Sequence, residues 1–333
     1  MKFKHLQLLI FVCVGLSAGL ASENPSSSQK FAEKFQLVLQ GKAEQDFTVG
    51  LALGAGAAKG FAHIGVLDAL EQAGVRIDMI AGSSMGSIIG GGYASGLSVA
   101  TLSKVAVESD WFDVLTLLDP IFPTRGFIDG QKIESFLDDL FEHRNIEDLA
   151  IPFAATTVDI MAGELYILNS GNLAKAARAS SSIPIVFNPQ SNGDMVLVDG
   201  GMIDPVPIDV VRSMGADYII AVNVLAFADD SITEKNLQYL NADLITNSKS
   251  TWHFPKANEA WYAAGKPNMA EIAHETVILS MALIAANQVE LARPDLLINV
   301  STGLTAWNFL EAEIAIQKGY DEAVEALARV KNK

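Results

Sequence analysis

The chain has 333 residues, half of them hydrophobic, and a formal net charge of −16. This composition is typical of a globular protein and excludes a disordered chain. Because an acidic protein is repelled by nucleic acid and by anionic lipid, we expect no nucleic-acid partner. We expect any peripheral membrane contact to use apolar side chains rather than a basic patch.

The N-terminus has the pattern of a secretory signal peptide. Lys2 and Lys4 carry positive charge, residues 6–20 are apolar, and the small residues Gly19 and Ala21 follow. The apolar stretch is shorter than the roughly 20 residues of a membrane-spanning helix. We therefore predict a signal peptide at residues 1–22 and export to the periplasm or the medium. An uncleaved membrane anchor is the alternative.

The exported chain is predicted to depend on its core alone. The only cysteine, Cys13, lies inside the signal segment, so disulfides, thiolate metal sites and a cysteine nucleophile are excluded. The sequence contains no metal-ligand cluster, and we expect neither a metal nor a cofactor. Residues 23–46 read as a leader with a short amphipathic helix at 30–40, and residues 47–333 as one folded domain.

From residue 47 onward, short apolar runs alternate with helical patterns. This alternation predicts an α/β fold, with a mostly parallel central sheet between two layers of helices. Residues 226–267 are irregular and rich in aromatic side chains, which favours either a lid or ordinary packing. We expect strands at 47–53, 75–81, 152–159, 165–168, 195–198, 217–224 and 296–300. We expect helices at 60–73, 85–94, 131–141, 173–180, 207–214, 269–291 and 309–330.

A Gly-x-Ser-x-Gly pentapeptide occupies residues 82–86, between a predicted strand and a predicted helix. A nucleophilic hydroxyl needs a sharp strand-to-helix turn, and small residues beside it relieve the crowding there. Ser84 is the central residue, flanked by Gly82 and Gly86. The alternative is a glycine-serine turn that opens an ordinary helix.

A loop of small residues, Gly-Ala-Gly-Ala-Ala-Lys-Gly at 54–60, follows the first predicted strand. Such loops let backbone N–H groups point at a negative oxygen. A P-loop is excluded because Lys59 is followed by Gly60 and Phe61 rather than by Ser or Thr. A dinucleotide fingerprint is weakened because Lys59 takes the place of its third glycine, although Asp78 lies at a suitable distance for a ribose contact.

The third element is Asp199, followed by Gly200 and Gly201 at the end of a predicted strand. Alone it reads as an ordinary turn. Ligand sites in parallel α/β sheets gather at the carboxyl ends of the strands, and all three elements follow strands. We therefore expect them to meet at one site.

Together these three blocks resemble the signature blocks of the patatin-like phospholipase family, in its bacterial and neuropathy-target-esterase form. Further segments resemble the family in order, and the likeness runs from about residue 48 to residue 327. These segments are residues 125–130, 151–155, 179–187, 215–217, 293–295 and the helix around Gly319 and Tyr320.

The resemblance implies a patatin-like three-layer αβα fold and a Ser-Asp dyad that hydrolyses acyl esters. Ser84 would be the nucleophile and Asp199 the base, with a lipid, phospholipid, lysophospholipid or simple ester as substrate. Backbone N–H groups of Gly56, Ala57 and Met85 would form the oxyanion hole. The remaining motif residues are Gly54, Lys59, Gly60, Gly82, Gly86, Gly200 and Gly201.

The chain departs from the family where many members have three consecutive glycines. Ala55 and Ala57 flank Gly56 here, and alanine tolerates positive φ poorly, so catalytic efficiency is in question. The main rival hypothesis is a patatin-fold protein that binds lipid and turns it over weakly. Lys59 is expected to be an exposed lysine near this loop.

No histidine is expected to complete a triad. His63 lies in the first helix among apolar neighbours, His143 in an exposed charged run and His253 in the irregular stretch. His274 follows Asp199, as in α/β-hydrolases, but it lies inside a helical pattern. Residues 111–127, an apolar segment, are a candidate lining of an acyl-chain pocket or a membrane-facing rim, or else plain core.

Overall fold

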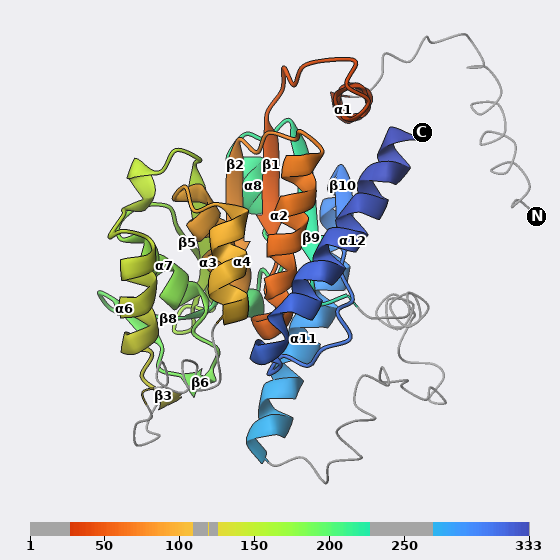
Figure 1. Cartoon of the computed structure of the whole chain (residues 1–333). Coiled ribbons are helices and arrows are strands. Elements are labelled where there is room, and N and C mark those ends of the chain that lie inside the picture. Colours follow the sequence, from red (N-terminus) through yellow and green to blue (C-terminus); the bar gives the residue numbers. More distant parts are fainter. Residues whose placement is uncertain (1–26, 109–118, 120–125, 227–268, 333) are drawn as a thin grey trace, which may run out of the picture.

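A computed structural model describes residues 27–108, 119, 126–226 and 269–332 (Figure 1). The predicted signal peptide, nearly all of the irregular stretch 226–267 and most of the apolar segment 111–127 lie outside the described residues. The helices are α1 (Ser27–Leu39), α2 (Ala62–Gln72), α3 (Met85–Ala94), α4 (Val99–Glu108), α6 (Gln131–Leu140), α7 (Leu173–Ser180), α8 (Ile208–Ser213), α11 (Met269–Ala292) and α12 (Ala312–Lys331). Short 3₁₀ turns are η1 (Ala57–Phe61), η2 (Ile146–Asp148), η3 (Gly200–Met202) and η4 (Phe309–Glu311).

The strands form one large sheet and one small sheet. They are β1 (Val49–Leu53), β2 (Met79–Ser83), β3 (Gly126–Ile128), β4 (Phe153–Asp159), β5 (Glu164–Leu168), β6 (Ile185–Phe187), β7 (Gln190–Asn192), β8 (Met195–Asp199), β9 (Tyr218–Asn223) and β10 (Leu296–Asn299). The large sheet has the order β10-β9-β1-β2-β4-β8-β7, with β5 paired to β4. Its half from β10 to β4 is parallel, whereas β5, β7 and β8 are antiparallel to their neighbours.

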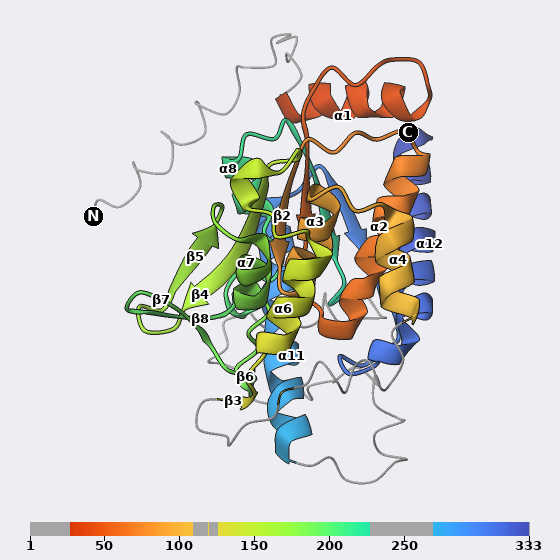
Figure 2. The ribbon, with the colours of Figure 1, turned by 60° about the vertical axis from the view of Figure 1, so that its left-hand side comes forward.

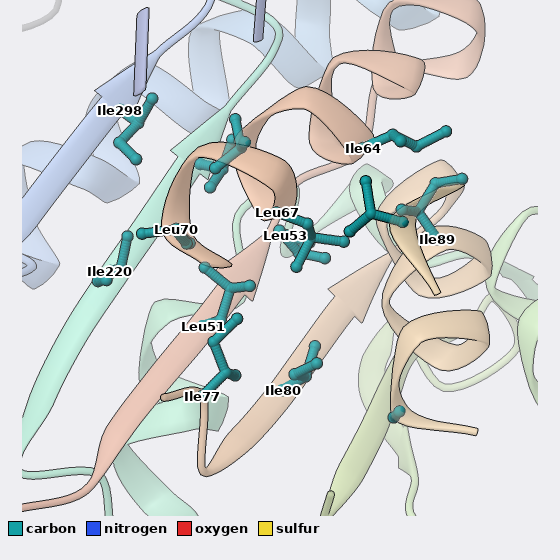
Figure 3. Close-up of a cluster of buried hydrophobic side chains, with 14 of the residues drawn as sticks. Leu51, Leu53, Ile64, Leu67, Leu70, Ile77, Ile80, Ile89, Ile220 and Ile298 are labelled. Carbon is teal, nitrogen blue, oxygen red and sulfur yellow. The ribbon is translucent and has the colours of Figure 1, made fainter. Parts of the chain in front are cut away.

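Helices cover both faces of this sheet, which confirms the three-layer α/β prediction (Figures 1 and 2). Residues along β1 alternate between the faces, as the two-residue period of a strand requires. Leu51 and Leu53 point into the larger core beneath α2 and α12, while Ala52 points into the smaller core beneath α8 and α11. Figure 3 shows the larger core, in which Ile64, Leu67 and Leu70 of α2 lie over the strands.

The predicted helix in the leader is present as α1, and it packs on the sheet domain. Phe35 is fully buried and its ring stacks on Tyr218 of β9, with ring centroids 4.3 Å apart. Phe31 and Phe35 both contact the ring of Phe47. Burying such an aromatic ring contributes roughly 1.5–3 kcal/mol. The packed structure therefore extends N-terminally beyond residue 47 to include α1.

The predicted elements are present, and the differences are local. Helices α3 and α7 have the predicted bounds, whereas β2 lies at Met79–Ser83 rather than at 75–81. Helix α4 and the three-residue strands β3, β6 and β7 were not predicted. By length and composition alone, the stretch Glu275–Ala292 of α11 is apolar enough to cross a membrane, and 22% of it is buried. A helix in the core of a globular protein can be equally long and apolar.

Candidate active site

Strand β4 brings the predicted nucleophile and base together. Strand β5 pairs with one edge of β4 along residues 155–159, so β2 and β8 share the opposite edge. Ser83 at the end of β2 pairs with Thr156, and Asp199 at the end of β8 pairs with the next residue, Thr157. Because β2 and β8 run in opposite directions along this edge, their carboxyl ends meet. The residue after Ser83 is Ser84, which is therefore placed beside Asp199.

Ser84 occupies a strained turn between β2 and α3. Its φ and ψ are 53° and −124°, a conformation that costs a non-glycine residue about 1–3 kcal/mol. The flanking glycines make room for this turn. A Cβ on Gly82 would lie 2.5 Å from the Gly86 carbonyl oxygen, and one on Gly86 would lie 2.2 Å from that of Leu53. This is the sharp strand-to-helix turn that the pentapeptide predicts for a nucleophilic serine.

The Ser84 hydroxyl donates a hydrogen bond to Asp199, with Oγ 2.7 Å from Oδ2. The other carboxylate oxygen, Oδ1, accepts the Gly201 N–H at 2.8 Å, so the carboxylate is oriented at both ends. Both side chains are buried in the described structure. Burial raises the pKa of Asp199 to about 7, against the opposing effect of these two hydrogen bonds. A carboxylate of that basicity is suited to accept a proton near neutral pH.

The end of α7 holds the backbone of both residues. The Ser84 N–H donates to the Ser180 hydroxyl at 2.9 Å, and the Asp199 N–H donates to the Ser182 carbonyl at 3.0 Å. The buried Arg178 donates in turn to the Ser182 hydroxyl at 2.6 Å and to the Gly130 carbonyl at 3.1 Å. These positioning contacts were not predicted. Residues 179–187, which include Ser180 and Ser182, were noted only for their resemblance to the family. A serine that accepts a hydrogen bond from a distant backbone N–H has no local pattern in the sequence.

The predicted oxyanion loop follows β1 and continues into η1. The N–H groups of Gly56, Ala57 and Met85 find no acceptor among the described residues. Ala57 has φ 46°, so alanine does occupy a left-handed position here, at a cost of roughly 1–2 kcal/mol relative to glycine. At Gly56 the requirement is space, because a Cβ there would lie 2.3 Å from Val224 Cγ2. The donors therefore remain available despite the alanine substitutions.

The other motif glycines lie where the backbone packs closely against neighbouring elements. A Cβ on Gly60 would lie 2.4 Å from Met85 Cγ, and one on Gly54 would lie 2.9 Å from the Val222 carbonyl oxygen. A Cβ on Gly200 would lie 2.2 Å from the Thr156 carbonyl oxygen. At Gly201 it would lie 2.1 Å from Met281 Cε of α11. The structure thus brings the Ser84 turn, Asp199 with its glycines and the loop of Gly56 close together.

Lys59 differs from its prediction, because it is mostly buried on η1 rather than exposed. Burial lowers the pKa of its ammonium group, and the charge of Glu275 on α11 opposes that shift. His143 is exposed as predicted and bonds Asp138, with 2.7 Å between Nδ1 and Oδ2. His274 lies within α11 as predicted, but its side chain and the whole of His253 lie outside the described residues.

The dinucleotide interpretation is wrong. Asp78 precedes β2, so it lies at the amino ends of the strands, opposite the site. Its carboxylate is already occupied, since Oδ2 accepts the Val49 N–H at 2.8 Å and Oδ1 accepts Arg76 Nε at 2.7 Å. Within the described residues, no group of three or more His, Cys, Asp or Glu side chains is arranged to hold a metal ion.

Fold and site together define a three-layer α/β protein with a serine–aspartate pair at the carboxyl edge of its sheet. The family model of the patatin-like phospholipases matches residues 51–212, which contain all three blocks. Residues 51–212 are therefore a patatin-like phospholipase domain.

Similar proteins agree with this assignment. An uncharacterised NTE family protein of Mycobacterium tuberculosis is 39% identical over 176 residues, covering 53% of this chain and 49% of that protein. The neuropathy target esterase sws of Drosophila melanogaster is 35% identical over 195 residues, covering 56% of this chain and 13% of that protein. The chain thus spans about half or less of the length of these relatives. The crystal structure of VipD from Legionella pneumophila shares the fold, with a TM-score of 0.52 and 14% identity over 86% of this chain and 67% of that one.

Proposed function

We propose that this protein is a serine acyl-ester hydrolase that acts on lipid esters through a Ser84–Asp199 dyad. The observation that carries the proposal is the 2.7 Å hydrogen bond from Ser84 Oγ to Asp199 Oδ2 at a strained strand-to-helix turn. The patatin-like phospholipase domain at residues 51–212 supports a lipid substrate. Phospholipids and lysophospholipids are the substrate classes to test first.

In the proposed mechanism, Ser84 Oγ attacks the ester carbonyl carbon while its proton passes to Asp199. The negative oxygen of the tetrahedral intermediate binds the N–H groups of Gly56, Ala57 and Met85. The intermediate collapses, the alcohol leaves with the proton from Asp199, and an acyl group remains on Ser84. Water then attacks this acyl-enzyme, giving its proton to Asp199, and the second intermediate collapses. The carboxylic acid leaves, and the proton returns from Asp199 to Ser84.

The direct test is hydrolysis of short- and long-chain p-nitrophenyl esters by wild type, Ser84→Ala and Asp199→Asn. We expect activity in wild type and its loss in both variants, with an alkyl fluorophosphonate labelling Ser84 in wild type alone. Equal hydrolysis by wild type and Ser84→Ala would contradict the proposal. A His143→Ala variant is a matched control, because that histidine is exposed and its ring contacts the acidic neighbours Asp138 and Asp139.

A second candidate function is lipid binding with slow turnover, and the observation that favours it is the left-handed φ of 46° at Ala57. Energy stored in that residue is available to distort the loop that presents the donors. Ala57→Gly distinguishes the two functions. A large rise in the turnover number after this change would indicate that the wild type mainly binds lipid and hydrolyses it slowly. Little change would indicate that the wild type is already a competent hydrolase.

We propose that the acyl chain lies against an apolar cluster beside the dyad, named here the α11 cluster. It combines side chains of the oxyanion loop with side chains of α11 and its neighbours. Its buried members are Ala55, Ala57, Ile183, Leu225, Ile278, Met281, Ala282 and Ala306. Charged substitution at Ile278 is expected to impair long-chain esters more than short ones, and equal impairment of both would contradict this placement.

We also propose that peripheral membrane contact, if the substrate is bilayer lipid, uses apolar side chains near this cluster. Ile203, directly after η3, is 41% exposed, and Ile272 of α11 is 51% exposed. An Ile203→Asp, Ile272→Asp variant is expected to bind zwitterionic vesicles less while hydrolysing a soluble ester as before. Export by the N-terminal segment remains a prediction, to be tested by N-terminal sequencing of the secreted or periplasmic protein.

A further inference from the structure

His63 is a buried imidazole that the proposed reaction does not use. It lies on α2 with no exposed surface, and its Nε2 is 2.7 Å from the carbonyl oxygen of Gly54. Because a carbonyl oxygen only accepts hydrogen bonds, Nε2 must carry the proton. Nδ1 is then a bare acceptor, and it has no partner among the described residues. Burial lowers the pKa of His63 to about 4, so the ring is neutral near pH 7.

A neutral histidine in this setting needs an explanation. An unpaired buried acceptor such as Nδ1 costs about 1–3 kcal/mol, and a leucine of similar size would avoid that cost. A leucine, however, cannot donate a hydrogen bond to the Gly54 carbonyl oxygen. The polar ring is thus explained by the carbonyl it binds, rather than by packing among its apolar neighbours Ala62 and Ile64.

Gly54 is the point where the serine turn and the oxyanion loop meet. Its carbonyl oxygen lies 2.7 Å from the position that a Cβ on Gly86 would take. Its N–H donates to Val222 at 3.0 Å, and the next N–H, of Ala55, donates to Pro205 at 2.8 Å. Rotation of the peptide between residues 54 and 55 is therefore restrained on both sides, and His63 supplies the restraint on the carbonyl side.

We propose that His63 is a positioning residue, which fixes the Gly54 carbonyl and thereby holds the N–H groups of Gly56 and Ala57 in place for the oxyanion. This role rests on the proposed hydrolase function. The strained Ala57 follows three residues after Gly54, so the loop needs such a restraint more than a run of glycines would. The restraint acts before substrate arrives, which is what preorganised stabilisation of an oxyanion requires.

The test compares His63→Leu, which lacks the donor, with His63→Gln, whose amide nitrogen reaches a similar position. Ile64→Val, a loss of one methylene from the neighbouring core residue, is the matched control. In folded His63→Leu we expect kcat to fall by about 10–100-fold with KM unchanged, and His63→Gln to recover most of it. The inhibition constant of an alkyl trifluoromethyl ketone, which forms an anionic adduct with serine, is expected to rise by the same factor. That of the unfluorinated ketone is expected to stay constant.

Two readouts do not depend on turnover. Amide hydrogen exchange in the peptide 54–61 is expected to be faster in His63→Leu than in wild type, and unchanged in Ile64→Val. In ¹⁵N-histidine spectra of the wild type at neutral pH, His63 is expected as the Nε2–H tautomer. Unaltered exchange in folded His63→Leu, or an Nδ1–H tautomer in wild type, would overturn the proposal. If wild type shows no Ser84-dependent turnover, the hydrolase function fails, while these two readouts still decide whether His63 restrains the loop at Gly54.

Discussion

The proposed role of Asp199 as the base predicts a pH dependence of the activity, and the burial of the carboxylate sets its position. An ordinary aspartate of pKa 3.8 would be ionised throughout the neutral range, whereas burial raises the pKa of Asp199 to about 7. Only the ionised carboxylate can accept the Ser84 proton. At two units below its pKa, about 1% of the carboxylate is ionised, so kcat/KM is expected to fall about tenfold per unit below pH ~7 and to level off above it.

The assay measures the rate at which a soluble short-chain ester releases its alcohol, from about pH 5 to pH 9. The buried Asp204, whose pKa burial raises to about 6, is the group that most resembles Asp199. Asp204→Asn is therefore the control, and it should leave the midpoint of the profile in place. A profile that stays level down to about pH 5, or a midpoint that moves with Asp204→Asn, would refute the assignment of Asp199 as the base.

The raised pKa of Asp199 affects stability in the opposite direction: activity is expected to rise with pH, whereas the stability of the fold is expected to fall. Because the folded pKa of Asp199 exceeds its unfolded value, the folded state binds the proton more tightly, and stability falls as pH rises from 3.8 to about 7. The whole shift corresponds to roughly 4 kcal/mol. Asp199→Asn is therefore expected to be inactive and yet to melt at a higher temperature than wild type above pH ~8, by calorimetry. An equal or lower melting temperature there would contradict the idea that the carboxylate is held at a cost.

Three further changes test other contacts. Gly201→Ala should lower kcat strongly, because the new Cβ would lie 2.7 Å from Ala55 Cβ in the oxyanion loop and 3.1 Å from Asp199 Oδ1; near-normal turnover by steady-state kinetics would count against it. Ser180→Ala should lower kcat about tenfold or more by leaving the Ser84 N–H without its acceptor, and Ser180→Thr should restore much of the loss. Phe35→Ala should lower the free energy of unfolding by about 3–5 kcal/mol in urea titrations, and a negligible change would mean that α1 packs only weakly on β9.

Most of the fold was predictable because it depends on local patterns. The elements α3 and α7 begin and end where the sequence predicts, since the period of apolar residues and the flanking turn residues agree. Helix α4 was missed although its buried residues Val99, Leu102 and Ala106 follow a helical period. The strands β3, β6 and β7 have three residues each, too few for an alternating pattern to be recognised.

The site was predictable to the extent that its residues stand in motifs. Ser84, Asp199 and the loop of Gly56 can be recognised from the residues adjacent to them in the sequence, and the structure places them together. The Ser180 hydroxyl binds Ser84, which is 96 positions away in the sequence. The His63 ring nitrogen binds Gly54, which is 9 positions away. Such contacts depend on how the layers pack, so no local pattern reveals them. Lys59 was mispredicted for the same reason, because its burial depends on packing, and Glu275 of α11, whose charge acts on it, is distant in sequence.

The shared edge of β4 has a consequence for how proteins with this domain can vary. Ser84 and Asp199 lie 115 positions apart in the chain, yet their separation in space is set by two consecutive residues, Thr156 and Thr157. Insertions in the loops between the two motifs therefore leave the pair undisturbed. One extra residue between Thr156 and Thr157 would instead shift the two strand ends by about 3.3 Å, enough to break the hydrogen bond. Variation in length is thus tolerated in the loops between the two motifs and excluded at one peptide bond of β4.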